Sequence, residues 1–341
     1  MRQAYSFEDV LLTPKYSDVE SRTQVNIRNN LDSYTKLELP VISSPMDTIT
    51  ENEMAIAMCQ AGGLGIIHRY NSITQQTALV RSVAAVGSQR YIGAAIGVTG
   101  DYEERACALY DAGARILCID VAHGHHSLVK NALSTLRKIF GNKLHMMAGN
   151  VATLEGFDAL ASWGADSIRV GIGGGSICST RLVTGHGVPT LQSILDCAKT
   201  EYDTKIIADG GMKTTGDIVK AYAAGADFVM VGSMLAGTTE TPGEVFLGKT
   251  DKKYKIYRGM ASANAQNAWR GNSSTPEGIS TTVPYKGSVE QILQNIAGGI
   301  RSGLSYSGAR TLAEFQAKAT FLLQSSAGQL ESNTHILWRN K

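Results

Sequence analysis

Eight short apolar runs rich in valine and isoleucine constrain the fold of this chain more than any other feature. Each run is bounded by glycine or polar residues, and its apolar residues are continuous rather than alternating, which is typical of strands buried on both faces. The pattern therefore predicts a parallel sheet covered by helices. In chain order the runs lie at 41–46, 64–68, 92–98, 116–122, 144–151, 167–173, 205–211 and 228–233.

Helix-like segments separate these runs. Within 51–62 the apolar positions 54, 57, 58 and 61 fall on one helical face, because they follow the i, i+3, i+4, i+7 spacing. Repeated strand–helix units predict parallel strands joined by crossovers, and eight units fit a closed (β/α)8 barrel of the α/β class. An open doubly wound sheet has the same local pattern and is the alternative at this point. Several helix-like segments end in a glycine that signals a helix C-terminus, namely Gly62, Gly113 and Gly225.

Two long connections stand out against this regular repeat. Successive runs start 23 to 28 residues apart, except for 38 residues between the sixth and the seventh. The extra length follows 167–173, and loops after strands form the barrel face on which active sites lie. Residues 234–287 are polar and lack clear periodicity, which predicts a functional loop or flap. Helix patterns follow at about 288–303 and 311–323. We predict a single catalytic domain over 1–341.

Charge and cysteine usage exclude several classes of protein. Lys plus Arg number 32 and Asp plus Glu number 30, a net charge of +2, which argues against a nucleic-acid or membrane-surface partner. The five cysteines have no paired spacing, so neither a disulfide framework nor a zinc ribbon is indicated. No secretory signal is visible, and no apolar run approaches the roughly 20 residues that span a bilayer. We expect a cytoplasmic protein.

The loop after the sixth run carries the strongest catalytic candidate. It reads GIGGGSICSTR and places Cys178 among glycines and hydroxyl residues beyond a strand end. A lone cysteine is more often an inert packing residue, but this loop context favours a nucleophile. The loop is not a dinucleotide fingerprint, because Ser176 stands where the last glycine of GxGxxG is required. A Rossmann dehydrogenase is therefore disfavoured.

Other strand ends carry groups that recognise ligands. Gly210-Gly211 and Gly232-Ser233 end the last two runs, where barrels commonly hold a phosphate on backbone N–H groups; tight turns without a ligand are the alternative. Asp209 is then placed to accept bonds from ribose hydroxyls. Asp120 and Asn150 end the fourth and fifth runs and favour polar ligand recognition. Three histidines after Asp120 suggest a metal, but no ligand set with recognisable spacing accompanies them.

With these residues in view, the sequence resembles the IMP dehydrogenase / GMP reductase family from about residue 5 to 335. The Cys178 loop is the most specific of the matching segments. The segments are SPMDT at 44–48, GGLGIIH at 62–68, DVAHGH at 120–125, AGNVAT at 148–153, VGIGGGSICSTR at 170–181, ADGG at 208–211, DFVMVGSMLAGTTETPGE at 227–244 and YRGM at 257–260.

The resemblance implies a (β/α)8 barrel, assembled as a homotetramer, that binds a purine nucleoside monophosphate. It implies that Cys178 attacks purine C2 and that Thr180 and Glu277 relay protons there. Asp120 and Asn150 would line the side of a nicotinamide cofactor, NADPH or NAD. The expected substrate contacts are Ser176, Gly211, Gly232, Ser233 and Tyr257 at the phosphate, Asp209 at the ribose and Met260 at the base, with Gly210 in the same substrate site. In the dehydrogenase branch, carbonyls matching Gly173, Gly175 and Cys178 hold a monovalent cation such as potassium.

The chain also departs from the family pattern. Gly174 replaces the usual proline of the cysteine loop, and the regulatory domains that normally follow the second unit are missing. Between Met260 and Glu277 there is no room for the long dehydrogenase flap, and Arg270 is followed by Gly271 rather than by the tyrosine of the family's Arg-Tyr pair. These features favour the reductase branch, since the dehydrogenase needs a flap base to activate water.

Other segments favour the dehydrogenase branch. Four segments look more like the bacterial dehydrogenase, namely SPMDT, TPEG, VPYKG and RSGLSYSGAR. In addition, Ser274 replaces the arginine that is usual in the reductase. On balance we expect reductive deamination of GMP to IMP with NADPH, and the alternative is oxidation of IMP to XMP with NAD. An inactive nucleotide-binding paralogue is a further alternative, against which the intact Cys178, Thr180 and Glu277 argue.

Overall fold

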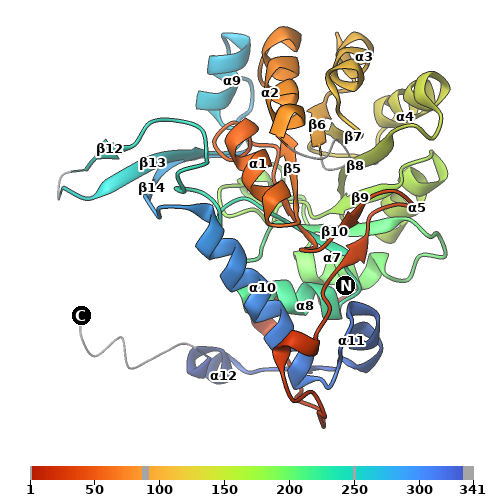
Figure 1. The fold of residues 1–341 in the computed structure, drawn as a ribbon, viewed down its shortest axis with the longest axis vertical. Helices are drawn as coiled ribbons and strands as arrows, with labels where there is room; N and C mark the ends of the chain where they lie inside the picture. The colour runs from red at the N-terminus through yellow and green to blue at the C-terminus, as the bar shows by residue number, and fades with distance from the viewer. Residues whose placement is uncertain (1, 87–91, 249–250, 333–341) are drawn as a thin grey trace.

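A computed structural model of the chain describes residues 2–86, 92–248 and 251–332. Its centre is a closed barrel of eight parallel strands in chain order, in which β11 pairs with β4 to close the sheet (Figure 1). The predicted (β/α)8 barrel is therefore confirmed, and the open sheet is excluded. The barrel strands are β4 (Val41–Ser43), β5 (Leu64–Ile67), β6 (Ile92–Ile96), β7 (Ile116–Asp120), β8 (His145–Val151), β9 (Ser167–Val170), β10 (Lys205–Asp209) and β11 (Phe228–Val231).

Both faces of these strands are buried, which explains why their sequences are continuously apolar. Neighbouring residues on one strand belong to different cores: Leu117 packs in the large outer core, whereas Ile116 and Cys118 pack in a second cluster with side chains of other strands. Leu31 and Leu37, from the segment of the short pair β2 (Asn29–Asn30) and β3 (Lys36–Leu37), join that second cluster.

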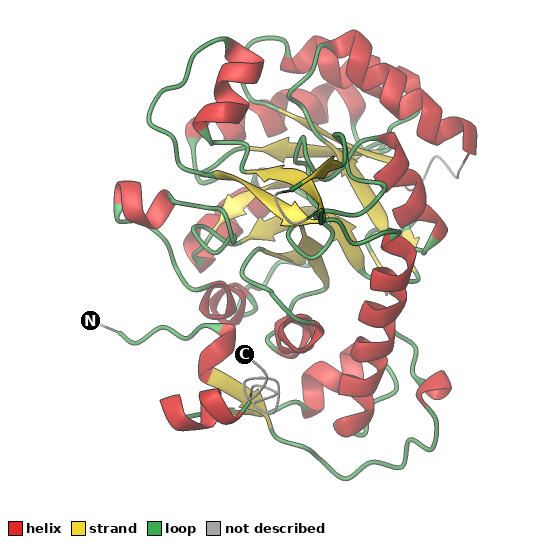
Figure 2. Cartoon of the chain, turned by 90° about the vertical axis from the view of Figure 1, so that its left-hand side faces the viewer, coloured by secondary structure: helices red, strands yellow, loops and turns green. Residues whose placement is uncertain are grey.

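Helices surround the strands (Figure 2). Three of them are followed by the glycines that the sequence identified as stop signals, and Gly62, Gly113 and Gly225 have φ values of 80°, 115° and 112°. Glycine adopts this left-handed conformation without the steric cost that other residues meet. The helices of the repeat are α1 (Asn52–Gln60), α2 (Ile73–Val86), α3 (Tyr102–Ala112), α4 (Ser127–Phe140), α5 (Leu154–Ser162), α7 (Thr190–Cys197), α8 (Thr215–Ala223) and α10 (Val289–Tyr306).

A strand near the start of the described chain pairs with one near its end. Strand β1 (Val10–Leu12) pairs antiparallel with β15 (Phe321–Leu323), between α11 (Leu312–Lys318) and α12 (Ser326–Glu331). The helix expected over 311–323 is thus wrong in its last residues, because Phe321–Leu323 pair with the N-terminal strand. Single-turn helices lie at Phe7–Asp9 and Arg22–Gln24. No helix in the described part of the chain is long and apolar enough to cross a membrane.

The aperiodic segment after β11 contains regular structure. Strands β12 (Phe246–Leu247), β13 (Lys253–Arg258) and β14 (Ser280–Pro284) form an antiparallel sheet that projects from the barrel (Figure 1). Helix α9 (Ala263–Arg270) lies between β13 and β14 in the chain. Because β13 pairs with a strand on the other side of a helix, short-range sequence patterns do not reveal this sheet.

Helix α10 packs closely on α8 through two glycines one turn apart. A Cβ atom added at Gly299 would lie 2.3 Å from Cγ2 of Thr215, and one at Gly303 would lie 2.5 Å from Cγ1 of Val219. At the neighbouring Gly298 no heavy atom lies within 4 Å of such a Cβ. The helices approach this closely at Gly299 and Gly303 because these two positions lack side chains.

This packing predicts opposite effects of alanine at adjacent residues. Gly299→Ala should lower the free energy of unfolding by about 1–3 kcal/mol, because the methyl group forces the helices apart. Gly298→Ala should raise it by about 0.5–1 kcal/mol, because alanine restricts the unfolded chain and meets no neighbour. Urea unfolding followed by circular dichroism measures both, and equal effects of the two substitutions would contradict the described packing.

Candidate active site

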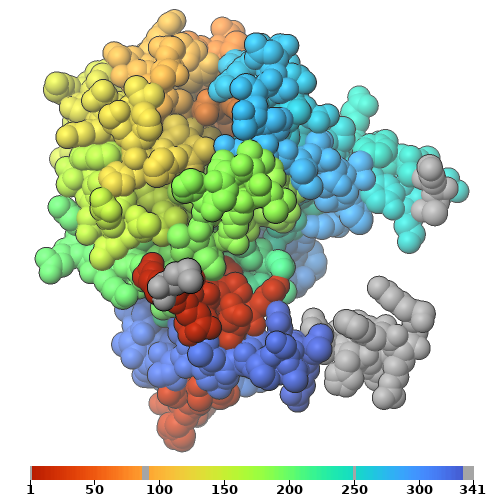
Figure 3. Space-filling model, turned by 180° about the vertical axis from the view of Figure 1, so that it is seen from behind, coloured from red at the N-terminus to blue at the C-terminus, as the bar shows by residue number. Residues whose placement is uncertain are grey.

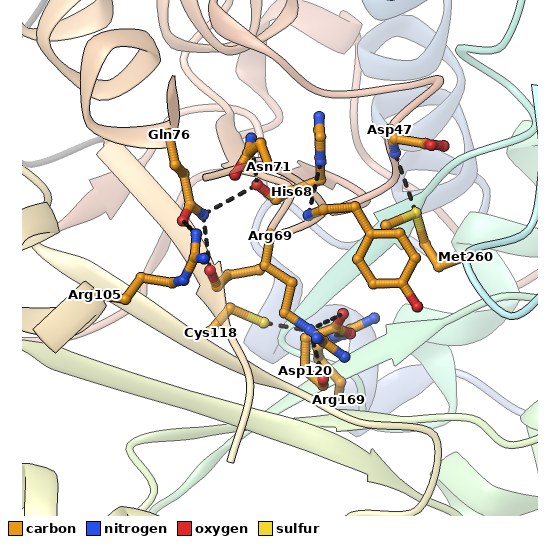
Figure 4. Close-up of polar contacts among 12 residues, drawn as sticks. Asp47, His68, Arg69, Asn71, Gln76, Arg105, Cys118, Asp120, Arg169 and Met260 are labelled. Atoms are coloured by element: carbon orange, nitrogen blue, oxygen red, sulfur yellow. Dashed lines mark hydrogen bonds and ion pairs between the residues drawn. The ribbon is translucent and has the colours of Figure 1, made fainter. Parts of the chain in front are cut away.

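The carboxyl ends of four neighbouring strands gather a polar cluster. Arg169 on β9 donates from Nη1 to Oδ1 of Asp120 at 2.6 Å and from Nη2 to Oδ2 of Asp209 at 2.9 Å. Asn150 on β8 donates to the same Asp209 oxygen at 2.8 Å. Figure 4 shows Arg169, Asp120 and Arg69 side by side. The structure thus brings together Asp120, Asn150 and Asp209, which the sequence predicted, around an arginine that it did not identify.

The arginines of this cluster keep the carboxylate of Asp120 ionised. Burial alone would raise the pKa of Asp120, but the charges of Arg169 and Arg69 outweigh burial and hold the pKa below its ordinary value. Burial likewise opposes the charge of Arg169, yet Asp209 and the other anionic groups around it keep its pKa well above the ordinary value. Asp120 is therefore an ionised hydrogen-bond acceptor at neutral pH.

Cys178 lies on the glycine-rich loop after β9 and is exposed. Its thiol donates to Oγ1 of Thr180 at 3.1 Å, and its N–H donates to the carbonyl of Gly175 at 3.1 Å. Thr180 begins the short helix α6 (Thr180–Thr184). By contrast, Cys118 and Cys197 are buried, and burial raises the pKa of both thiols to about 12. Cys178 is therefore an accessible thiol that contacts a threonine hydroxyl.

Main-chain hydrogen bonds hold Glu277 beside this cysteine. The N–H of Ser179 donates to the carbonyl of Glu277 at 3.0 Å, and the N–H of Glu277 donates to the carbonyl of Ala261 at 3.0 Å. Cys178 and Gly278 form an isolated antiparallel bridge at the same place. Cys178, Thr180 and Glu277 are therefore neighbours, although the Glu277 carboxylate forms no hydrogen bond with the described residues.

The predicted phosphate contacts also adjoin one another. Gly210 and Gly211 have φ values of 84° and 82°, and a Cβ on Gly210 would lie 3.2 Å from the backbone nitrogen of Gly175. Oγ of Ser176 lies 3.4 Å from Oη of Tyr257, the atom that a Cβ on Gly232 would approach to 3.4 Å. The turns after β9, β10 and β11 therefore meet around Tyr257, whose pKa is raised by burial so that its hydroxyl stays protonated.

The turn after β4 forms a wall beside these groups. Met46 would lie 3.2 Å from a Cβ on Gly232, and the N–H of Asp47 donates to Sδ of Met260 at 3.2 Å (Figure 4). The Asp47 carboxylate also forms an ion pair with Arg258. Met260 is thus fixed next to the strand ends. The carbonyl of Ser233 accepts a bond from Nζ of Lys286 at 3.2 Å.

The cysteine loop is packed closely despite its glycines. A Cβ at Gly174 would lie 2.3 Å from Oγ1 of Thr190, so the threonine hydroxyl fills the space that a side chain at 174 would need. Gly173 has a φ of 81°. The carbonyls of Gly173 and Cys178 accept no hydrogen bond from the described backbone, whereas that of Gly175 accepts one. Carbonyl oxygens of this kind are suitable ligands for a monovalent cation.

A cavity of about 490 Å³ lies between the ends of β6 and β7 and helix α9. Arg69, Arg105 and Arg270 line it together with Asp101. Arg105 donates to Oδ2 of Asp101 at 2.7 Å. It also donates to Oε1 of the buried Gln76 at 2.7 Å (Figure 4). The sequence did not reveal this cavity, because its three arginines belong to separate units; the Asp101–Arg105 spacing of four residues was the available signal.

Helix α9 forms one wall of the cavity. The Trp269 ring stacks on Tyr70 with centroids 5.9 Å apart and planes 16° apart. From behind, the light-blue surface of this segment lies beside the orange surface of the second strand–helix unit (Figure 3). Arg270 forms no ion pair or hydrogen bond with the described residues, so its charge is available to an anion in the cavity.

The closed barrel is of the (β/α)8 class, and the exposed thiol of Cys178 and the carboxylates of Asp120 and Asp209 follow strand ends, where enzymes of this class carry their active sites. Residues 4–335 match the family model described as "IMP dehydrogenase / GMP reductase domain". The chain therefore belongs to the IMP dehydrogenase / GMP reductase family, whose members are purine-nucleotide oxidoreductases.

Its relatives carry both names. An inosine-5'-monophosphate dehydrogenase from Nitrosopumilus maritimus is 34% identical over 98% of each chain, and a GMP reductase from Leishmania major is 34% identical over 98% of this chain and 97% of its own. The first alignment spans 473 positions and this chain has 341 residues, so at least 132 positions of the relative have no counterpart here.

A solved structure resembles the whole molecule. A cysteine-to-alanine variant of GMP reductase from Trypanosoma brucei, in complex with guanosine 5'-monophosphate, superposes with a TM-score of 0.92 at 30% identity, covering 98% of both chains. The family is thus established by sequence and by fold, whereas the names divide between two reactions.

The different environments of the cysteines predict their reactivity. In the folded protein, iodoacetamide should label the exposed Cys178 and Cys107 well before Cys118 and Cys197, whose burial excludes the reagent and disfavours the thiolate. Peptide mapping by mass spectrometry over time measures this order, with urea-unfolded protein as the control in which all five thiols react. Early labelling of Cys118 or Cys197 in folded protein would contradict the structure.

Proposed function

We propose that this enzyme catalyses the NADPH-dependent reductive deamination of GMP to IMP and ammonia. The observation that carries the proposal is the short segment between Met260 and Glu277. Its ends are joined to each other, since the N–H of Glu277 donates to the carbonyl of Ala261, and its helix rests on Tyr70 through Trp269. Such a segment leaves little chain to move a water-activating base to Cys178, which the oxidative reaction requires and the reductive one does not.

The nucleotide is proposed to bind across the ends of β9, β10 and β11. Backbone N–H groups of Gly210, Gly211, Gly232 and Ser233, with the hydroxyls of Ser176 and Tyr257, would hold the phosphate. Glycine at these turns lets the backbone approach an anion closely. Asp209 has one oxygen bonded to Arg169 and Asn150, which leaves the other to accept ribose hydroxyls. Met260 would contact the base.

The chemistry is proposed to begin at the Cys178 thiol. Its bond to Thr180 gives the proton a first acceptor, and Glu277, whose main-chain carbonyl is bonded to Ser179, would continue the relay. The thiolate bonds to C2 of the purine, and the amino group at C2 takes up a proton and leaves as ammonia. The reduced nicotinamide cofactor supplies the hydride that reaches C2, after which the C2–S bond breaks and IMP is released.

Asp120 and Asn150 are proposed to face the nicotinamide end of the cofactor. The adjoining cavity, with Arg69, Arg105 and Arg270, has the charge to hold the anionic remainder of NADPH. A potassium ion would be held by the carbonyls of Gly173, Gly175 and Cys178 and would steady the loop. A homotetramer and a cytoplasmic location stay predictions.

Oxidation of IMP to XMP with NAD is the second candidate function. One observation favours it: Arg270 lines the cavity that extends to Val121, the residue after Asp120, and it forms no ion pair with the described residues. An arginine there is placed to act on water once an oxidised cofactor has left. The dehydrogenase from Nitrosopumilus maritimus, at 34% identity, supports the same candidate.

Assays of both reactions separate the two candidates. We expect GMP plus NADPH to give loss of absorbance of the reduced cofactor with release of ammonia, and IMP plus NAD to give no sustained turnover. Arg270→Ala should then leave the rate constant of the reductive step within about twofold, while it weakens cofactor binding. Steady conversion of IMP to XMP that is lost in Arg270→Ala would assign the protein to the dehydrogenase reaction.

Replacement of the thiol tests the nucleophile. Cys178→Ala should lose turnover by about a thousandfold or more, because no covalent adduct forms, while GMP affinity measured by calorimetry stays within about threefold. Cys107→Ala, which removes the other exposed thiol, is the matched control and should keep full activity. Substantial turnover by Cys178→Ala would remove the assignment, and absence of turnover in the unaltered protein with every purine monophosphate would point to an inactive paralogue.

A further inference from the structure

Arg169 has an unusual position for a positive charge. It lies next to the carboxyl end of β9, is 6% exposed and reaches strand-end carboxylates on both sides. Nε and Nη2 both donate to Oδ2 of Asp209, at 3.1 and 2.9 Å, and Nη1 donates to Oδ1 of Asp120 at 2.6 Å. Nη1 also lies 3.5 Å from Sγ of Cys118.

We propose that Arg169 is a shared positioning residue, which orients Asp209 toward the nucleotide and Asp120 toward the nicotinamide cofactor at the same time. The inference rests on the proposed function, because that function assigns the two carboxylates to two ligands. Arg169 itself touches neither reacting group in this account; it acts through Asp209 and Asp120.

The shape of the contacts argues for an arginine at this position. The guanidinium is a planar fork with five donors, and three of its N–H groups are used here by two carboxylates on opposite sides. A lysine has the same charge but presents one nitrogen, so it can hold one carboxylate well or both poorly. Each carboxylate also keeps an oxygen for other donors: Oδ1 of Asp209 has no partner among the described residues, and Oδ2 of Asp120 lies 3.5 Å from Nε of Arg69.

A purely structural role explains the arrangement less well. Backbone ladders already join β8, β9 and β10 over several residues, so the barrel does not need this side chain to close. Buried ion pairs contribute little net stability compared with apolar residues of similar size. A charged group between two carboxylates therefore has its main effect on their orientation and ionisation.

Binding measurements on substituted proteins test the proposal. The variants are Arg169→Met, which removes the charge, and Arg169→Lys, which keeps the charge without the fork. Arg69→Met is one control, because Arg69 contacts Asp120 and not Asp209. Arg137→Met is the second control, because Arg137 pairs with Asp166, away from the strand-end carboxylates. Calorimetry with GMP, IMP, NADP and NAD gives the affinities, and circular dichroism shows which variants are folded.

The proposal predicts a specific pattern of affinities. Arg169→Met should weaken binding of both nucleotide and cofactor by about tenfold to a hundredfold. The reason is that Asp209 and Asp120, no longer oriented, each lose charge-assisted hydrogen bonds to their ligand. Arg69→Met should weaken the cofactor alone, and Arg137→Met neither. If Arg169→Met weakens only one ligand, or neither while remaining folded, the inference is wrong. If Arg169→Met does not fold, Arg169→Lys decides the question. We expect it to weaken the binding of both ligands, and weakened binding of only one ligand or of neither would contradict the inference.

The pH dependence adds a readout that a structural role would not change. Asp120 faces Arg69, Arg169 and the neutral Cys118 thiol, with Asp209 beyond the guanidinium. Without Arg169 the pKa of Asp120 rises, so loss of cofactor affinity on acidification should begin at a higher pH in Arg169→Met. In Arg169→Lys, the pH at which cofactor affinity begins to fall should return toward that of the unaltered protein. If this pH is the same in Arg169→Met as in the unaltered protein, the role of Arg169 is contradicted.

These measurements separate the inference from the proposed function. If the unaltered protein binds neither GMP nor IMP, the proposed function has failed and the inference fails with it. If it binds and turns over a purine monophosphate while the Arg169 variants bind both ligands normally, the function stands and only the inference is removed.

Discussion

Closure of the parallel sheet between β11 and β4 is the constraint on which the rest of the structure depends. Because the strands are parallel and the barrel has no free edge, their carboxyl ends all lie on one side. Residues as far apart in the sequence as Asp120 and Asp209 can then contact one guanidinium. The helices outside the barrel stabilise this arrangement through an apolar layer, including the glycine contacts of α10 on α8.

Two sets of interactions organise the site on that face. Charged hydrogen bonds around Arg169 fix the acidic residues, whereas a ladder of main-chain hydrogen bonds fixes the cysteine loop against residues 277–279. The thiol of Cys178 is left exposed between them, in contact with Thr180. A backbone fixed around an accessible thiol suits the role of nucleophile proposed for Cys178. The relatives carry the names of two reactions, and this site does not by itself separate them.

Much of this could be predicted from the sequence, and the rest could not for physical reasons. The eight apolar runs and the left-handed glycines after α1, α3 and α8 are local signals, and the cysteine loop is a compact motif. Arg169 lies inside a predicted strand and looked like an ordinary strand residue, since its two partners come from other units. The sheet of β12, β13 and β14 could not be predicted either, because α9 separates the paired strands β13 and β14 in the sequence. Gly174 stands where the family usually has a proline, and only the structure shows that the hydroxyl of Thr190 occupies the space beside it.

The most direct test of the account is a crystal structure of the protein with GMP bound. The account predicts the phosphate on the backbone of Gly211 and Gly232, the ribose hydroxyls on the free oxygen of Asp209, and purine C2 within bonding reach of Sγ of Cys178. The Asp120–Arg169–Asp209 contacts should persist unchanged in that complex. A nucleotide whose phosphate lies in the cavity beside Trp269, or whose C2 points away from Cys178, would contradict the account.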